Sequence, residues 1–69
     1  MMYAVKISWW NDNLVSRDYY GEVWGTYSGY DEEHASVEKY ASKEEAEARV
    51  EYLKNRNGGY VKVEIKEGA

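Results

Sequence analysis

The chain has 69 residues with no cysteine and no proline, and its 13 acidic residues against 9 basic ones give a formal net charge of −4. This length predicts a single domain over residues 1–69 with a small core. The lack of cysteine excludes disulfides and thiolate zinc sites. The negative charge disfavours direct binding to nucleic acid or anionic membranes, and suits a basic partner. Because no apolar run could span a membrane and no signal peptide opens the chain, we expect a cytoplasmic protein.

The first predicted strand covers residues 2–10, where apolar and polar side chains alternate. Successive side chains in a strand point to opposite faces of the sheet. Val5, Ile7 and Trp9 would therefore face the core, while Ser8 and Trp10 would lie on the other face. This strand is rich in apolar residues, and we expect it at the centre of the sheet.

A turn is predicted at residues 11–13, Asn-Asp-Asn, because these side chains bond their own backbone. Residues 14–20 then form a less certain returning strand, and residues 19–30 are rich in glycine and aromatic residues. Two interpretations of residues 19–30 stay open. Either they form an irregular hairpin whose rings pack on the sheet edge, or they present an exposed aromatic surface. The rings concerned are Tyr20, Trp24, Tyr27 and Tyr30.

The second half of the chain predicts a strand, a helix and a strand. Residues 31–34 are a polar connector. Residues 35–41 form a strand that either contains a bulge or buries only one of Val37 and Tyr40, because these two residues fall on opposite faces of a regular strand. Residues 42–57 have a cap at Ser42, helix-forming residues throughout, and Gly58-Gly59 as a stop. Their apolar stripe is Ala46, Val50 and Leu53. Residues 60–66 alternate as a strand, with Val61, Val63 and Ile65 facing inward.

These elements predict an α+β fold. We expect a small, mainly antiparallel sheet of three or four strands with one helix packed on one face, in the order β-β-(β)-α-β. The helical crossover makes the last strand parallel to the strand before the helix. The opposite face of the sheet would stay in contact with water.

The inventory of reactive side chains predicts no catalytic residue, no metal site and no cofactor. His34 is the only imidazole and lies in a polar turn, which is typical of a solvated side chain. The adjacent acids at 31–33 do not have the spacing of a known metal loop. Stacking of the rings on single-stranded bases is an alternative that the acidity disfavours. A small enzyme would need a cleft with a perturbed carboxylate, which a sequence does not display.

The plan of the chain resembles that of short proteins encoded by phages and mobile elements. The segments that carry this likeness are YAVKISW near the start, SKEEAEARVEYLKN in the helix and YVKVEI near the end. In size, acidity and lack of catalytic residues, the chain is most similar to anti-CRISPR proteins and other host-takeover inhibitors. The resemblance implies stoichiometric binding to a basic, nucleic-acid-handling host protein, by occlusion or by mimicry of phosphate charge.

Our leading hypothesis is therefore a non-enzymatic protein-binding module, acting as a monomer or a homodimer. The alternative is a self-associating structural protein that buries its aromatic stretch against a second copy. Interface energy concentrates in aromatic residues, and flanking carboxylates would attract a basic partner. The predicted partner-binding residues are Tyr20, Glu22, Trp24, Tyr27, Tyr30, Asp31, Glu32 and Glu33, with Trp10 on the open sheet face as a further candidate.

Overall fold

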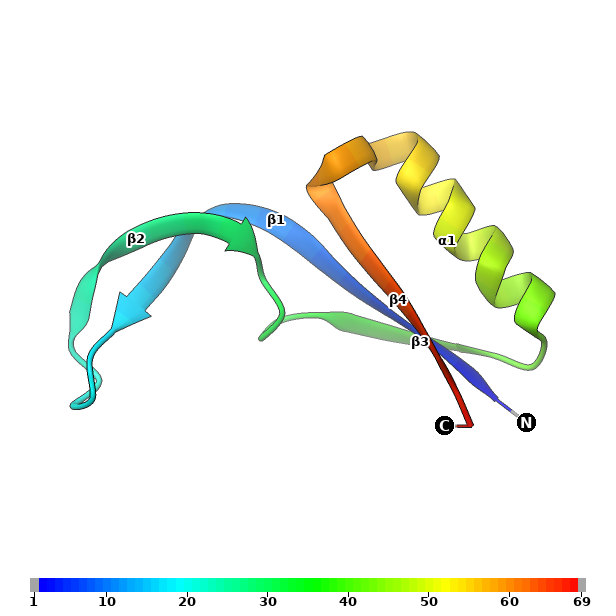
Figure 1. The fold of residues 1–69 in the computed structure, drawn as a ribbon, viewed down its shortest axis with the longest axis horizontal. Coiled ribbons are helices and arrows are strands. Elements are labelled where there is room, and N and C mark those ends of the chain that lie inside the picture. The colour runs from blue at the N-terminus through cyan, green and yellow to red at the C-terminus, as the bar shows by residue number, and fades with distance from the viewer. Residues whose placement is uncertain (1, 69) are drawn as a thin grey trace.

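A computed structural model describes residues 2–68. Its elements are β1 (Tyr3–Arg17), β2 (Val23–Tyr30), β3 (Ser36–Tyr40), α1 (Lys43–Asn57), a 3-10 turn (Gly58–Tyr60) and β4 (Val61–Glu67). All strand pairs are antiparallel, and the helix lies on one side of the sheet (Figure 1). The predicted α+β class and the order β-β-β-α-β are confirmed.

The predicted turn at residues 11–13 is wrong. These residues lie inside β1, a strand of 15 residues that runs without a turn from Tyr3 to Arg17. The register against β2 shifts between Asn11 and Leu14, and the N–H of Asn13 donates to Oδ1 of Asn11 at 2.8 Å. Asn and Asp side chains bond nearby backbone in a bulge as readily as in a turn, so the sequence signal is the same for both.

The hairpin turn instead lies at residues 18–22, so residues 14–20 are not a separate returning strand. Oδ1 of Asp18 accepts hydrogen bonds from the N–H groups of Tyr20 and Glu22, at 2.8 and 3.0 Å. Gly21 has a φ of 84°, which a glycine adopts without strain. One carboxylate and one glycine therefore reverse the chain.

The two edges of β1 are used differently. Near its start, β1 lies between β3 and β4, which both pair with Tyr3–Ile7 and are therefore parallel to each other, as predicted. Farther along, β2 pairs with β1 from Trp10 to Arg17. The N–H of Asp31 donates to the carbonyl of Trp9 on one edge of β1, while Val61 pairs with Trp9 on the other edge. β2 and β3 therefore follow one another along the first edge, and β4 lies along the second. The hydroxyl of Tyr30 donates to the carbonyl of Gly59 at 2.6 Å, which links the end of β2 to the segment that precedes β4.

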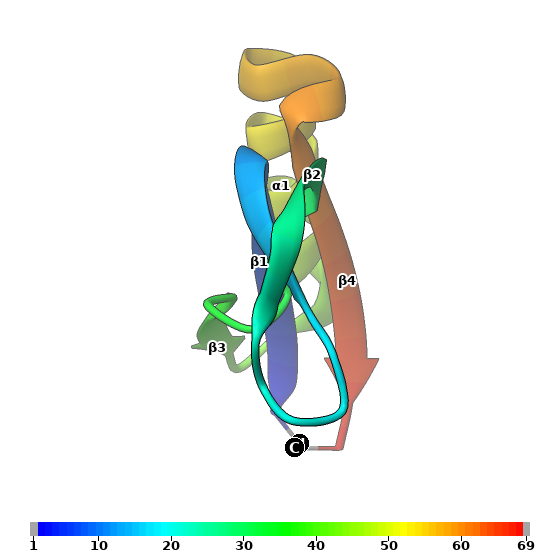
Figure 2. The same ribbon diagram turned by 90° about the vertical axis from the view of Figure 1, so that its left-hand side faces the viewer.

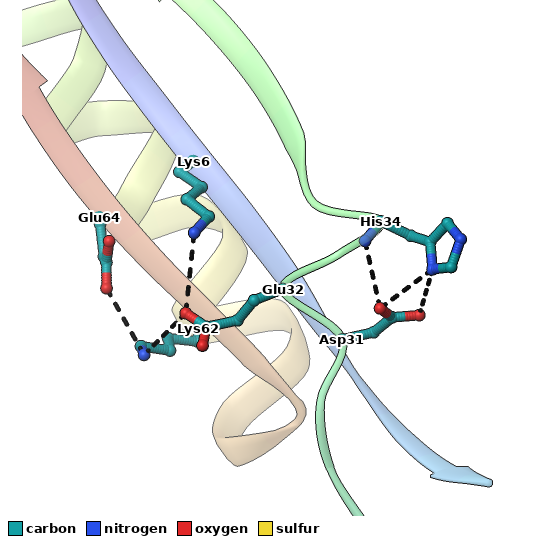
Figure 3. A network of polar contacts seen from close by, with 6 residues as sticks. All are labelled: Lys6, Asp31, Glu32, His34, Lys62 and Glu64. Atoms are coloured by element: carbon teal, nitrogen blue, oxygen red, sulfur yellow. Dashed lines mark hydrogen bonds and ion pairs between the residues drawn. The ribbon is translucent and has the colours of Figure 1, made fainter. Parts of the chain in front are cut away.

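Residues 31–35 connect β2 to β3, and Glu32 in this connector lies over the face of the sheet opposite the helix (Figure 3). Glu32 lies above the sheet, with its Oε1 3.7 Å from Nζ of Lys6 and 3.2 Å from Nζ of Lys62. Ser8, predicted to face water on this side, is only 2 % exposed. The sequence did not reveal that a connector would cover this part of the open face.

The helix agrees with its prediction. Oγ of Ser42 accepts from the N–H of Glu45 at 3.2 Å, and Gly58 follows the helix at a φ of 59° with its N–H bonded to the carbonyl of Lys54. Ala46 and Leu53 are buried, and Val50 packs beside them. Both ends of the helix therefore have their expected caps.

The core is small and lies wholly between α1 and the first half of β1 with its neighbours. Its buried members are Val5, Ile7, Ala46, Leu53 and Val61. In β3, Tyr40 packs against this core while Val37 is exposed, as the parity of the strand predicted.

Two residues predicted to face inward are more exposed than expected. Trp9 is 44 % exposed, because it pairs with Val61 at the beginning of β4, where the helix has already ended. Ile65 is 37 % exposed and lies beside Val50 and Glu47 at the margin of the helix. A single helix is too narrow to cover the whole apolar face of both strands.

The molecule is thin and elongated, measuring 43 × 25 × 10 Å over its Cα atoms. Its radius of gyration is 14.7 Å, whereas a compact chain of this length has one of about 11 Å. The excess comes from the part of β1 beyond Trp9 and from β2. We call residues 10–30 the arm; it projects from the core as a two-stranded ribbon (Figures 1 and 2).

Candidate functional site

The aromatic rings of the arm face water. Tyr20 is 86 % exposed, Trp24 is 79 % exposed and Tyr27 is 54 % exposed. The helix packs on the other end of the sheet, and no third strand pairs with the arm within residues 2–68. Of the two interpretations of residues 19–30, the geometry therefore supports the exposed aromatic surface for these three rings.

Trp10 and Tyr30 behave differently, because they fix the base of the arm. They are cross-strand partners, and their rings meet edge to face with centroids 5.2 Å apart. Nε1 of Trp10 donates to Oδ1 of Asp12 at 2.7 Å, and Oγ of Ser28 donates to the same oxygen at 3.2 Å. With the Tyr30–Gly59 hydrogen bond, these contacts tie the arm to the start of β4. Both residues are thus partly structural.

The predicted carboxylates do not form one cluster, because β2 separates them. Glu22 lies at the tip of the arm, and Asp31, Glu32 and Glu33 lie at its base. The eight residues of β2 between these ends span roughly 27 Å. The rings of Trp24 and Tyr27 lie between two acidic ends, which is the arrangement of rings and rim charges that the sequence predicted, drawn out along a strand.

Glu32 is already engaged by the sheet. Hydrogen bonding to Lys62, and then the charges of Lys62 and Lys6, lower the pKa of Glu32 below its ordinary value. Lys62 also lies 3.5 Å from Glu64, so the site is a small ion network on the open face (Figure 3). Glu33 makes no ion pair among the described residues and is exposed, so it is the carboxylate at this end that is available to a partner.

Asp31 is paired with His34. Nδ1 of His34 lies 3.0 and 3.1 Å from the two carboxylate oxygens, and its backbone N–H also donates to Asp31. Burial raises the pKa of Asp31. The hydrogen bonds and the charge of His34 together lower the pKa by more than burial raises it, so the net shift is downward. The His34 side chain is 75 % exposed, as predicted for a surface residue.

An open hollow of about 590 Å³ lies between this pair and the arm. Its walls include Asn11, Val15, Arg17 and Tyr27, so one side is the arm and the other is the connector. Among residues 2–68 no three His, Asp or Glu side chains come together as a metal site would require. The polar residues in the walls of the hollow could make hydrogen bonds to a ligand.

The sequence missed three exposed apolar side chains on the arm. Tyr19 is 95 % exposed and meets Tyr20 edge to face at the tip, with ring centroids 5.4 Å apart. Val15 and Val23 are also exposed, on β1 and β2. Val15 had been assigned to the returning strand of residues 14–20, and Val23 to the glycine- and aromatic-rich stretch of residues 19–30. These side chains are exposed because the single helix does not reach the arm, and the local sequence of the strands does not show this.

Comparison of the chain with protein-family models, curated proteins and solved structures found no match. Over residues 2–68, no helix has the length and apolar character needed to cross a membrane.

Proposed function

We propose that this chain is a non-enzymatic protein-binding module and that the arm is its binding surface. The observation that supports this most is the exposure of Trp24 at 79 % on a ribbon that projects from the core. A solvent-exposed tryptophan beside exposed tyrosines is a large apolar area, and such areas mark interaction surfaces. Trp and Tyr also lose little conformational entropy on binding, which makes them effective contacts.

The proposed partner is a basic, nucleic-acid-handling protein in the host cytoplasm, which the module inhibits in the manner of anti-CRISPR proteins. The net charge of −4 and the carboxylates at both ends of β2 support a basic partner. Such charges would raise the association rate and make it sensitive to salt, while the rings would determine the dissociation rate. Occlusion of the partner's nucleic-acid site by the acidic arm would then produce inhibition.

The experiment is a capture from host lysate followed by affinity measurement with the purified partner. We expect Trp24→Ala to weaken binding by at least ~2 kcal/mol with little change in melting temperature, because the ring contributes to the interface and not to the core. The matched control is Tyr52→Ala, which removes a ring that is 51 % exposed on the helix, far from the arm. The arm is not the binding surface if both variants bind like the parent, or if Tyr52→Ala has the larger effect.

A second candidate is self-association through the arm. The unpaired outer edge of β2 favours it, because an exposed strand edge is a template for another strand. Light scattering over a range of concentrations separates the two candidates. A dimer that persists on dilution and dissociates in Trp24→Ala would support self-association instead of a basic partner.

A further inference from the structure

From Gly25 to its end, the outer edge of β2 lacks the features that usually protect an edge strand. In the strand order β2 is terminal, so within the described residues one of its edges pairs with β1 and the other is open. Its sequence, VWGTYSGY, contains no charged residue and no proline. Edge strands usually carry lysine, proline or strong bulges that prevent pairing with other chains. This edge is therefore open to strand addition.

The register shows which backbone groups point outward. The N–H of Asp31 donates to the carbonyl of Trp9 at 2.9 Å, so at this residue the backbone faces β1. Backbone direction alternates along a strand, and β2 is regular from Gly25 to its end, because the nearer register shift adds residues only to β1. The N–H and C=O groups of Thr26 and Ser28 therefore point away from β1 and are free to pair.

The open edge of β1 is a weaker candidate. Its bulge interrupts the ladder, and the N–H of Asn13 is already bonded to the Asn11 side chain. It also carries the charged residues Asp12 and Arg17. By comparison, β2 offers an uncharged and regular segment.

Charge decides between the two occupants of the β2 edge. A second copy paired antiparallel across a two-fold axis would bring Glu22 of each chain toward Glu33 of the other, at both ends of the new ladder. Like charges opposite each other destabilise paired strands. A strand with basic residues at both ends would instead meet carboxylates at both ends, with the uncharged stretch of β2 between them.

We propose that the outer edge of β2 binds an extended segment of the partner by strand addition, and that this segment carries basic residues at both ends. This deepens the proposed function by naming the binding mode and the chemistry of the partner's segment. From Glu22 to Asp31 is nine residues along the chain, so the two basic ends lie roughly 30 Å apart. The main chain of β2 supplies the hydrogen bonds, and the end charges select the segment.

The test uses a labelled peptide of about ten residues, with two lysines at each end and alternating threonine and valine between them. The key variant is Thr26→Pro, which removes an outward N–H without removing a hydrogen bond to β1, and which follows a glycine that tolerates it. The matched control is Thr26→Ala, which changes the side chain and keeps the N–H. Circular dichroism and melting temperature check that both variants are folded.

We expect the parent and Thr26→Ala to bind the peptide with affinities within about twofold of each other. Thr26→Pro should bind at least about tenfold more weakly, and a peptide with glutamates in place of the lysines should not bind. If Thr26→Pro unfolds the protein, Thr26 N–H does not point outward and the proposal is wrong. It is also wrong if the basic peptide does not bind the parent, or if Thr26→Pro binds it normally.

Two further results would overturn the proposal while bearing differently on the arm as a binding surface. Dimerisation of the parent that Thr26→Pro abolishes would assign the edge to a second copy. Normal binding of the captured partner by Thr26→Pro, together with loss of binding in Trp24→Ala, would show that the partner covers the side chains and not the edge. In that case the proposed function would stand without strand addition.

Discussion

At the scale of single residues, the side chains divide into those that hold the fold and those that are free to bind. Glu38 illustrates the first kind. Its carboxylate accepts from the Tyr40 hydroxyl at 2.6 Å and from two guanidinium nitrogens of Arg49 at 2.9 and 3.3 Å, so it links β3 to the helix. Trp24 illustrates the second kind, since nothing in the fold requires its ring.

Glu38 gives the domain a predictable dependence on pH. Hydrogen bonds from Tyr40 and then Arg49 lower the pKa of Glu38 below its ordinary value of 4.5. A lowered folded-state pKa stabilises the fold above the ordinary pKa, and this contribution is lost as the pH falls through 4.5 toward the folded-state value. We expect Glu38→Gln to reduce the free energy of unfolding at pH 7 by less than about 1 kcal/mol, because the pair is partly exposed.

Urea unfolding of the parent and Glu38→Gln at pH 7 and at pH 3 measures this effect. The difference between the two proteins should shrink at pH 3, where the Glu38 carboxyl of the unfolded parent is protonated. Glu51→Gln, on an exposed part of the helix, is the control. A difference that is the same at both pH values would show that the carboxylate charge of Glu38 does not stabilise the fold.

At the scale of elements, a feature could be predicted when the residues that determine it lie close together in the sequence, and not when they lie far apart. The helix was predicted because its cap at Ser42, its stripe and its glycine stop all lie within the segment itself. The turn at residues 11–13 was predicted wrongly, because a bulge and a turn share the same Asn and Asp chemistry and only the register with β2 separates them. The burial of Ser8 could not be predicted, since it depends on a connector more than 20 residues later in the chain.

The helix stripe yields a stability prediction. Leu53 is 4 % exposed and packs in the five-residue core, so Leu53→Ala should lower the free energy of unfolding by about 2–5 kcal/mol. Thermal melting followed by circular dichroism measures the loss, with Val37→Ala as the control, because Val37 is 58 % exposed on β3. Equal melting temperatures for the two variants would mean that the helix does not pack as described.

At the scale of the whole molecule, the sequence predicted the class of the fold and the presence of rings and acids, but not their separation into a core and an arm. Asn11, Asp12 and Asn13 interrupt the alternation of β1, but the same residues suit a turn or a bulge, so they do not mark where the helix stops covering the sheet. The arm follows from arithmetic: a 15-residue helix spans roughly 22 Å, whereas the 15 residues of β1 span roughly 50 Å. A helix of this length is too short to cover the whole of β1, so the rest of the strand is left uncovered.

This division predicts that the arm can be shortened without loss of the fold. Every buried core residue lies outside residues 10–30, and the Trp10–Tyr30 pair closes the arm at its base. A variant that replaces residues 12–28 with an Asn-Gly turn keeps this pair in register, because Asn11 and Gly29 are direct partners and would flank the turn. We expect its free energy of unfolding to stay within about 1 kcal/mol of the parent, because isolated two-stranded ribbons contribute little stability.

The same variant should lose binding to the captured partner, since Trp24, Tyr27 and the edge of β2 are removed. Thermal melting and a binding titration on the same preparation measure both quantities, and unfolding of the shortened chain would show that the arm is part of the folding unit and not a separable binding element.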